Sequence, residues 1–113
     1  MFSQLPAVTR TLLIANLIGF ALQWLLPGLI EAWFALWPLD VNFQSWQLLT
    51  YGFLHGGLLH IALNMFGLTM FGADLERLWG PRRFITFYLV SVLAAGLTQL
   101  AFSAYTGDPT PTV

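Results

Sequence analysis

The segment GFLHGGLLHIALNMFG, residues 52–67, places two histidines and an asparagine in a run that is otherwise apolar or glycine. Polar side chains are unfavourable in hydrocarbon unless they face protein or water. If this run crosses a membrane, His60 and Asn64 therefore need a partner or a wet cavity. Whether it does so depends on the rest of the chain.

The composition of the chain is that of an integral membrane protein. Hydrophobic residues make up 58% of its 113 residues and charged residues only 8%, whereas a soluble domain carries about 25% charged residues. A net charge of −1 excludes a polybasic surface for nucleic acid. Cysteine is absent, which excludes disulfides and thiolate ligands. We therefore expect the lipid bilayer as a partner, and no nucleic acid, metal or cofactor.

Three apolar runs are long enough to cross a bilayer as helices. They cover about residues 9–26, 53–73 and 84–104. The second and third each reach about 31 Å at the helical rise per residue, which matches the hydrocarbon core. No small-x-small cleavage motif follows the first run, so we interpret it as an uncleaved anchor.

The arginines predict the orientation of these spans. Arg10 precedes the first run, and Arg77, Arg82 and Arg83 lie between the second and third. The positive-inside rule then places the N-terminus and a turn at 74–83 in the cytoplasm. The loop 27–52 and the tail 105–113 face outward. This loop is expected to lie in the headgroup zone because it is rich in aromatic residues, namely Trp33, Phe34, Trp37, Phe43 and Trp46.

If residues 53–73 form one helix, His60 and Asn64 project about 40° from each other. Gly56, Gly67 and Phe71 fall on the same stripe, which we expect to face the protein interior. The opposite side is mostly apolar and carries Leu58, Ala62, Met65 and Thr69.

The residues alone leave the role of this pair open. A histidine and an asparagine one turn apart in a membrane helix can serve simply as hydrogen-bonding links between helices. On the same helix His55 would lie about 140° from His60, which disfavours a shared metal ion unless the helix begins after Gly57. A bis-histidine haem is equally disfavoured, since both histidines come from one segment.

The stretch SWQLLTYGFLHGGLLHIALNMFGLTMFGADLERLWGPRRFITFYLVS, residues 45–91, resembles the first half of a rhomboid intramembrane serine protease. The resemblance is close over residues 45–100 and weaker over 1–44. It is carried by an ordered set: a tryptophan, LLTYGFLH, the spacing of His60 and Asn64, GADLERLWG and a basic turn. The resemblance implies an all-α membrane fold, in which residues 1–113 form three helices of a six-helix bundle with an interfacial aromatic loop after the first.

The resemblance also implies roles for individual residues. His60 and Asn64 match the histidine and asparagine that are assigned to the oxyanion hole. Such neutral donors stabilise the negative charge on the scissile carbonyl and are easier to bury than lysine or arginine. Residues that match structural positions are His55, Glu76, Arg77 and Gly80. Gln47 stands where the family usually has arginine, which puts the polar anchoring of the first loop in doubt.

The nucleophile and the base implied by the resemblance are not found in this sequence. The family nucleophile lies in a Gly-x-Ser-Gly segment of the fourth span, and Ser3, Ser45, Ser91 and Ser103 lack that context. His55 and His60 are the only histidines, whereas a further one on the sixth span acts as base. We therefore expect the N-terminal part of a rhomboid protease, which does not cut peptides by itself.

The complete parent is then expected to be a serine endopeptidase of a bacterial inner or plasma membrane. Its partners would be transmembrane protein substrates and the missing C-terminal helices of the same protein. Two alternatives remain open. One is an inactive rhomboid-like protein that binds transmembrane helices, and the other is a three-span structural or interaction protein complete at Val113.

Overall fold

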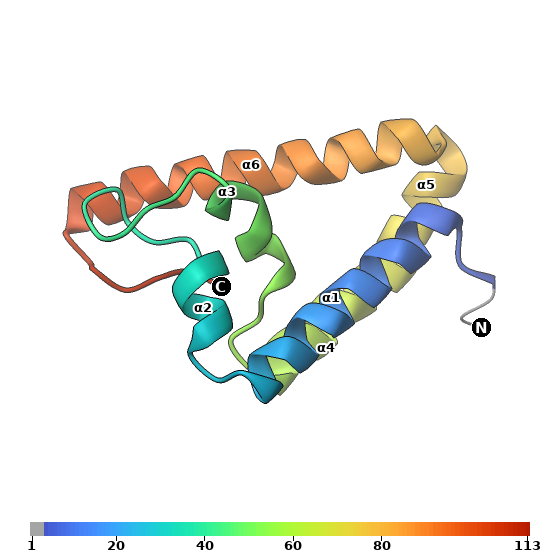
Figure 1. Ribbon diagram of the computed structural model, residues 1–113. Coiled ribbons are helices and arrows are strands. Elements are labelled where there is room, and N and C mark those ends of the chain that lie inside the picture. Colours follow the sequence, from blue (N-terminus) through green and yellow to red (C-terminus); the bar gives the residue numbers. More distant parts are fainter. Residues whose placement is uncertain (1–3) are drawn as a thin grey trace.

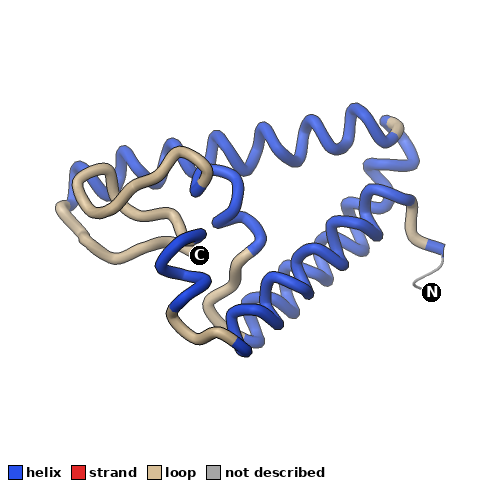
Figure 2. The backbone as a smooth tube through the Cα atoms, in the orientation of Figure 1, coloured by secondary structure: helices blue, strands red, loops and turns tan. Residues whose placement is uncertain are grey.

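In the part of the chain that the structure describes, the regular secondary structure is helical, and loops join the helices. The computed structural model describes residues 4–113, and within this range it contains no strand, only one isolated β-bridge between Leu36 and Thr112. The prediction of an all-α fold is confirmed. In chain order the elements (Figures 1 and 2) are α1 (Ala7–Leu25), α2 (Leu29–Phe34), α3 (Gln47–Thr50), the 3₁₀ turn η2 (Tyr51–Phe53), α4 (Leu58–Gly67), the π-helical turn η3 (Leu68–Gly72), α5 (Ala73–Trp79) and α6 (Pro81–Thr106).

Among the described residues, three helical segments are long and apolar enough to cross a bilayer. They are α1, the continuous run of α4, η3 and α5 over Leu58–Trp79, and α6. With 19, 22 and 26 residues, they measure about 28, 33 and 39 Å at the helical rise per residue. Many of their large apolar side chains are exposed and suited to lipid, among them Leu17, Ile18, Leu59, Leu63, Val90 and Leu97.

The second span begins later than the predicted Phe53. Tyr51–Phe53 form the 3₁₀ turn η2, and Leu54 is extended, with φ −104° and ψ 154°. The helix starts only at Leu58, after two consecutive glycines. Glycine is a poor helix former, and the backbone of His55 is held by another helix, so these residues do not join α4.

The second span also ends later than the predicted Ala73. Helical geometry continues to Trp79, because Glu76 faces the start of α1 and keeps α5 packed there. The predicted turn at 74–83 shrinks to Gly80, whose φ of 87° is a left-handed value that glycine adopts freely. Pro81 then opens α6, a position where its missing N–H costs nothing. α6 ends at Thr106 and α1 covers Ala7–Leu25, within two or three residues of the predictions.

The helices form a V-shaped arrangement. Figure 1 shows α1 and α4 side by side, and α6 diverging from them as it leaves α5. Near the vertex of the V, Leu12, Leu68 and Phe84 form a buried cluster that joins the three spans. Residues 47–53, which pack against α6 and α1, occupy the open end.

Two glycines allow these elements to approach closely. A Cβ added at Gly19 of α1 would lie 2.6 Å from the carbonyl oxygen of Phe53. A Cβ at Gly52 would lie 2.8 Å from a methyl carbon of Val92 on α6. The 3₁₀ turn η2 is therefore wedged between the first and third spans because neither contact leaves room for a side chain.

A buried carboxylate joins the second span to the first. Glu76 is 4% exposed, and its oxygens accept hydrogen bonds from the backbone N–H groups of Val8 and Thr9 at 3.0 and 2.7 Å. The Thr9 hydroxyl donates a further bond of 2.8 Å. A negative charge at a helix N-terminus is favourable, because the first N–H groups of the helix have no other partner. Nearby, Arg77 donates to the Gln4 carbonyl at 3.0 Å.

The aromatic loop is anchored by Gln47, which is 1% exposed. Its side-chain oxygen accepts hydrogen bonds from the backbone N–H groups of Trp37 and Gln44, at 3.2 and 3.1 Å. Its nitrogen donates to the carbonyl of Trp33 at 3.3 Å. The glutamine thus supplies the polar anchoring that the absence of arginine had put in doubt.

Candidate functional site

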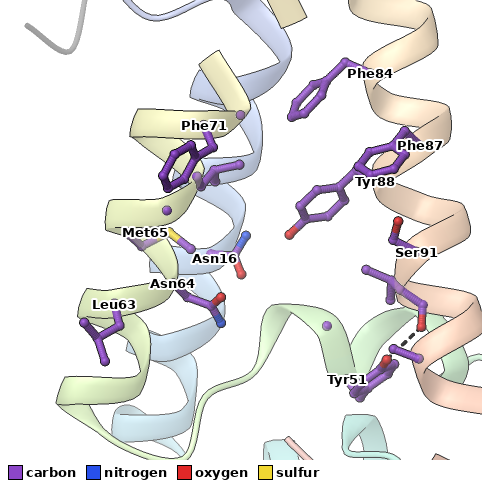
Figure 3. A pocket seen from close by; sticks show the side chains of 16 residues that line it. Asn16, Tyr51, Leu63, Asn64, Met65, Phe71, Phe84, Phe87, Tyr88 and Ser91 are labelled. Atoms are coloured by element: carbon purple, nitrogen blue, oxygen red, sulfur yellow. Dashed lines mark hydrogen bonds between the residues drawn. The ribbon is translucent and has the colours of Figure 1, made fainter. Parts of the chain in front are cut away.

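A pocket of about 610 Å³ lies between the α1–α4 pair and α6. Figure 3 shows its two walls, with Asn64, Met65 and Phe71 on one side and Phe84, Phe87 and Tyr88 on the other. Most of the lining is apolar. The polar groups that reach it are Asn16, Tyr51, Asn64, Tyr88 and Ser91.

Asn64 is exposed and lines this pocket, with its amide directed toward the space between the walls (Figure 3). Among residues 4–113 its side-chain amide has no hydrogen-bond partner. An amide carries two N–H donors, and an unpaired one costs free energy wherever water is excluded. Asn64 is therefore a donor available to whatever enters the pocket.

His60 lies one turn before Asn64, in the first turn of α4, and is also exposed. The backbone N–H of Gly56 donates to its Nδ1 at 3.0 Å. A nitrogen that accepts a hydrogen bond carries no hydrogen, so the neutral ring carries its hydrogen on Nε2. His60 does not belong to the lining of the 610 Å³ pocket. The structure thus brings the two predicted donors to one face, but only Asn64 to this pocket.

His55 is buried, at 2% exposed, and its ring packs edge-on against that of His60 with centroids 4.9 Å apart. Both ring nitrogens lack a hydrogen-bond partner in the described part of the chain. The expected separation of about 140° assumed one continuous helix; because α4 begins at Leu58, the two rings are neighbours instead. Burial lowers the pKa of His55, and repulsion from His60 adds to this effect.

His55 also lines a second, smaller cavity of about 360 Å³. Glu31 reaches the same cavity, and its Oε1 is buried without a partner. Two imidazole nitrogens and one carboxylate oxygen are therefore unsatisfied in one place. Over residues 4–113 the structure gathers no group of three or more His, Cys, Asp or Glu side chains that could hold a metal ion.

The face of α4 that packs against the rest of the chain is not the face of His60 and Asn64. Ile61 is buried and Met65 is half-buried, and each lies about 100° around the helix from the polar residue that precedes it, His60 or Asn64. The polar face was expected to point to the protein interior. In the described residues it is largely uncovered, apart from the contacts that His60 makes with Gly56 and with the ring of His55.

Sequence reasoning missed a buried polar stripe on α1. Thr9, Asn16 and Gln23 are 0%, 1% and 7% exposed, and each reaches a different place: the second span, the pocket or the segment that precedes the second span. Thr9 bonds Glu76, Asn16 reaches the pocket, and Gln23 bonds the backbone of His55. Their spacing of seven residues keeps them on one helix face. That spacing was visible in the sequence.

Comparison with known proteins identifies related sequences. The Rhomboid domain matches residues 42–113. The chain is 37% identical over 62 residues to the Rhomboid protease GluP of Bacillus subtilis (strain 168), covering 55% of this chain and 12% of that protein. It is 29% identical over 102 residues to the Rhomboid protease GlpG of Photorhabdus laumondii, covering 88% of this chain and 36% of that protein.

A third relative is the Rhomboid-like protease 3 of Toxoplasma gondii, which is 32% identical over 63 residues, covering 56% of this chain and 24% of that protein. The chain spans about a third or less of the length of these curated relatives. Its three apolar helices and the matched domain agree in describing an integral membrane protein. The chain belongs to the rhomboid family.

Proposed function

We propose that this chain is the part of a rhomboid intramembrane serine endopeptidase that supplies the donors of the oxyanion hole. The observation that carries the proposal is the state of the two predicted donors. The side-chain amide of Asn64 faces the 610 Å³ pocket and has no hydrogen-bond partner among residues 4–113. The Nδ1 of His60 is occupied by Gly56, which leaves an Nε2–H to donate.

These groups suit the chemistry of acyl transfer. Attack of a serine on a peptide carbonyl places negative charge on the carbonyl oxygen, and preorganised neutral donors stabilise that charge without rearranging. Both donors lie on one exposed helix face, one turn apart. A substrate carbonyl that meets this face could accept from both.

The nucleophile and the base belong, in this proposal, to other helices of the same protein. Ser91 lines the pocket, but its hydroxyl has no histidine partner among residues 4–113, and a serine hydroxyl needs an adjacent base to become nucleophilic. Ser3 lies outside the described residues. The uncovered polar face and the 610 Å³ pocket are where we expect the remaining helices to pack.

The same proposal gives the protein an orientation and a substrate class. Arg10 lies at the start of α1, the end of α1 that Glu76 holds, and Arg77, Arg82 and Arg83 follow Glu76 in α5 and the first turn of α6. By the positive-inside rule, this end lies on the cytoplasmic side of a bacterial inner or plasma membrane. His60 then lies toward the outer side, where transmembrane segments of substrate proteins would be cut.

The proposal is tested in two steps. A fluorophosphonate probe should label no serine of the 113-residue chain in membranes, but should label the product of the complete gene. In that complete enzyme, Asn64→Ala and His60→Ala should each lower kcat about 10²- to 10³-fold, the usual effect of losing one oxyanion donor.

Leu59→Ala is the matched control, because Leu59 is a lipid-facing neighbour on the same helix, 73% exposed. It should leave kcat within about twofold of the parent enzyme. Full turnover in the double variant of Asn64 and His60 would refute the donor role. A complete gene product that resists the probe would instead favour an inactive helix-binding protein.

A further inference from the structure

We infer that Gln23 on α1 is a positioning residue for His60. Its side chain fixes the backbone of His55, and thereby the Gly56 N–H that sets which nitrogen of His60 carries the hydrogen. The inference rests on the proposed function, since it explains how one oxyanion donor is held ready. Its structural part stands on contacts within this chain.

The side-chain amide of Gln23 is fully occupied. Its Oε1 accepts a hydrogen bond from the backbone N–H of His55 at 2.9 Å, and its Nε2 donates to the His55 carbonyl at 2.9 Å. The second hydrogen on Nε2 points to Glu31 Oε2 at 3.3 Å. Only one orientation of the amide satisfies both His55 contacts, which settles the assignment of oxygen and nitrogen. Gln23 is 7% exposed, so these bonds are shielded from solvent.

This clamp acts on a segment that regular structure does not restrain. η2 ends at Phe53 and α4 begins at Leu58, so the residues between them belong to neither helix. Gly56 and Gly57 have more conformational freedom than any other residue type would have there. In this segment, both backbone hydrogen-bonding groups of His55 are paired with Gln23.

The next contact passes the constraint to the ring. The Gly56 N–H directly follows the clamped residue and donates to His60 Nδ1 at 3.0 Å. A backbone N–H can bond this nitrogen only when the nitrogen carries no hydrogen. The neutral ring is therefore held as the Nε2–H form, with a donor on the side away from Gly56.

Without the clamp the other form becomes accessible. A free Gly56–Gly57 segment moves its N–H away from His60, and the hydrogen can then reside on Nδ1. In that form Nε2 presents a lone pair, which repels an oxyanion where it should donate to it. Gln23 thus acts on the reaction only through His60.

The tautomer can be measured in the 113-residue chain itself. Long-range ¹H–¹⁵N spectra of imidazole rings distinguish hydrogen on Nδ1 from hydrogen on Nε2, and a His60→Gln variant assigns the signals. The chain is labelled with ¹⁵N-histidine in detergent micelles at pH 8. We expect the Nε2–H pattern for His60 in the parent chain.

Gln23→Met keeps the length of the side chain and removes the amide. It should shift His60 to a mixture in which at least a quarter of the rings carry hydrogen on Nδ1. Gln99→Met is the matched control, because Gln99 lies half-buried on α6 and contacts Ser103, far from this segment in sequence. An unchanged Nε2–H pattern in Gln23→Met would overturn the inference.

If Gln23→Met loses its helical circular dichroism, Gln23→Asn decides the question. It keeps the amide but is one methylene shorter, so it cannot reach both backbone groups of His55 at hydrogen-bonding distance. A smaller shift in the same direction supports the clamp, and no shift refutes it.

In the complete enzyme, Gln23→Met should lower kcat by about 10- to 100-fold with little change in KM, since small errors in donor placement are costly. The spectra test the clamp and the kinetics test the donor role of His60, so one hypothesis can fail while the other stands. A tautomer shift without loss of kcat would leave the clamp standing and refute the donor role of His60.

Discussion

Oε1 of Glu76 accepts two hydrogen bonds from Thr9, one from its backbone N–H at 2.7 Å and one from its hydroxyl at 2.8 Å. The carboxylate is buried, and it is the main polar link between the second span and the start of the first. Glu76→Ala should lower the free energy of unfolding by about 3 kcal/mol, because hydrogen bonds to a charged group are lost and buried donors remain. Unfolding by denaturing detergent, followed by circular dichroism, measures the change.

Asp74→Asn is the control for Glu76. Its side chain is 77% exposed and makes only a 3.4 Å pair with Arg77 on the same helix. Exposed pairs of this kind contribute at most about 1 kcal/mol, so we expect little change. Equal losses in the two variants would show that the link to Thr9 does not stabilise the fold.

Acid should destabilise the fold through His55. Its pKa is lowered by burial, with a smaller contribution from His60, so the unfolded chain takes up a proton before the folded chain does. Well above pH 6.5, the ordinary pKa of histidine, His55 is neutral in both states and does not change the free energy of unfolding. As the pH drops through and below 6.5, the unfolded chain is protonated first and the free energy of unfolding falls. The titratable neighbours are Glu31 in the shared cavity and His60.

The measurement for His55 is the melting temperature in detergent between pH 8 and pH 5.5. His55→Phe keeps an aromatic ring without an ionisable group, and its melting temperature should fall less over this range than that of the parent. The same acid dependence in both proteins would place the titrating group elsewhere.

Replacing Gln47 should loosen the aromatic loop without disturbing the spans. Gln47→Leu leaves the N–H groups of Trp37 and Gln44 without their acceptor, at a cost of about 2 kcal/mol. We expect faster proteolysis within residues 27–52 and a shift in tryptophan fluorescence. Gln44→Leu, at an exposed position, should change neither. Intact protection in Gln47→Leu would contradict the anchoring role.

A methyl group at Gly19 should force α1 away from η2. Its Cβ would lie 2.6 Å from the Phe53 carbonyl oxygen, a backbone atom that cannot move alone. Gly19→Ala should therefore destabilise the chain by about 1–3 kcal/mol, as overpacking does. Gly67→Ala, where nothing lies within 4 Å of the added Cβ, should be neutral or slightly stabilising. Detergent unfolding of both variants tests the contrast, and equal stabilities would contradict it.

The number of membrane spans and their order along the chain could be predicted, because apolar runs of this length occur mainly as membrane-spanning helices. Their ends were harder to predict. Between Phe53 and Leu58 the sequence has no charged residue other than an ionisable His55, so hydropathy does not mark the point where the helix begins. The start at Leu58 depends on Gln23 holding His55, a contact between residues 32 positions apart.

The candidate site could be predicted only in part. His60 and Asn64 were found because polar groups stand out in an apolar run, and their shared face follows from helical geometry. The role of Gly56 in orienting His60 could not be deduced, since it depends on a backbone conformation outside the helix. Asn16 and Gln23 were passed over because a run was judged by its average hydropathy, although their burial is nearly complete.

The polar stripe of Thr9, Asn16 and Gln23 has a consequence for biogenesis. Asn16 donates to the Leu12 carbonyl within α1 itself. α1 is synthesised before α4 and α5, so when it meets the insertion machinery Thr9 and Gln23 still lack their partners from the later part of the chain. Glu76 can bond Thr9, and His55 can bond Gln23, only after the residues up to the end of the second span have left the ribosome. We therefore expect a released, truncated chain that ends before residue 55 to be extracted from the membrane more readily than one that ends after residue 80.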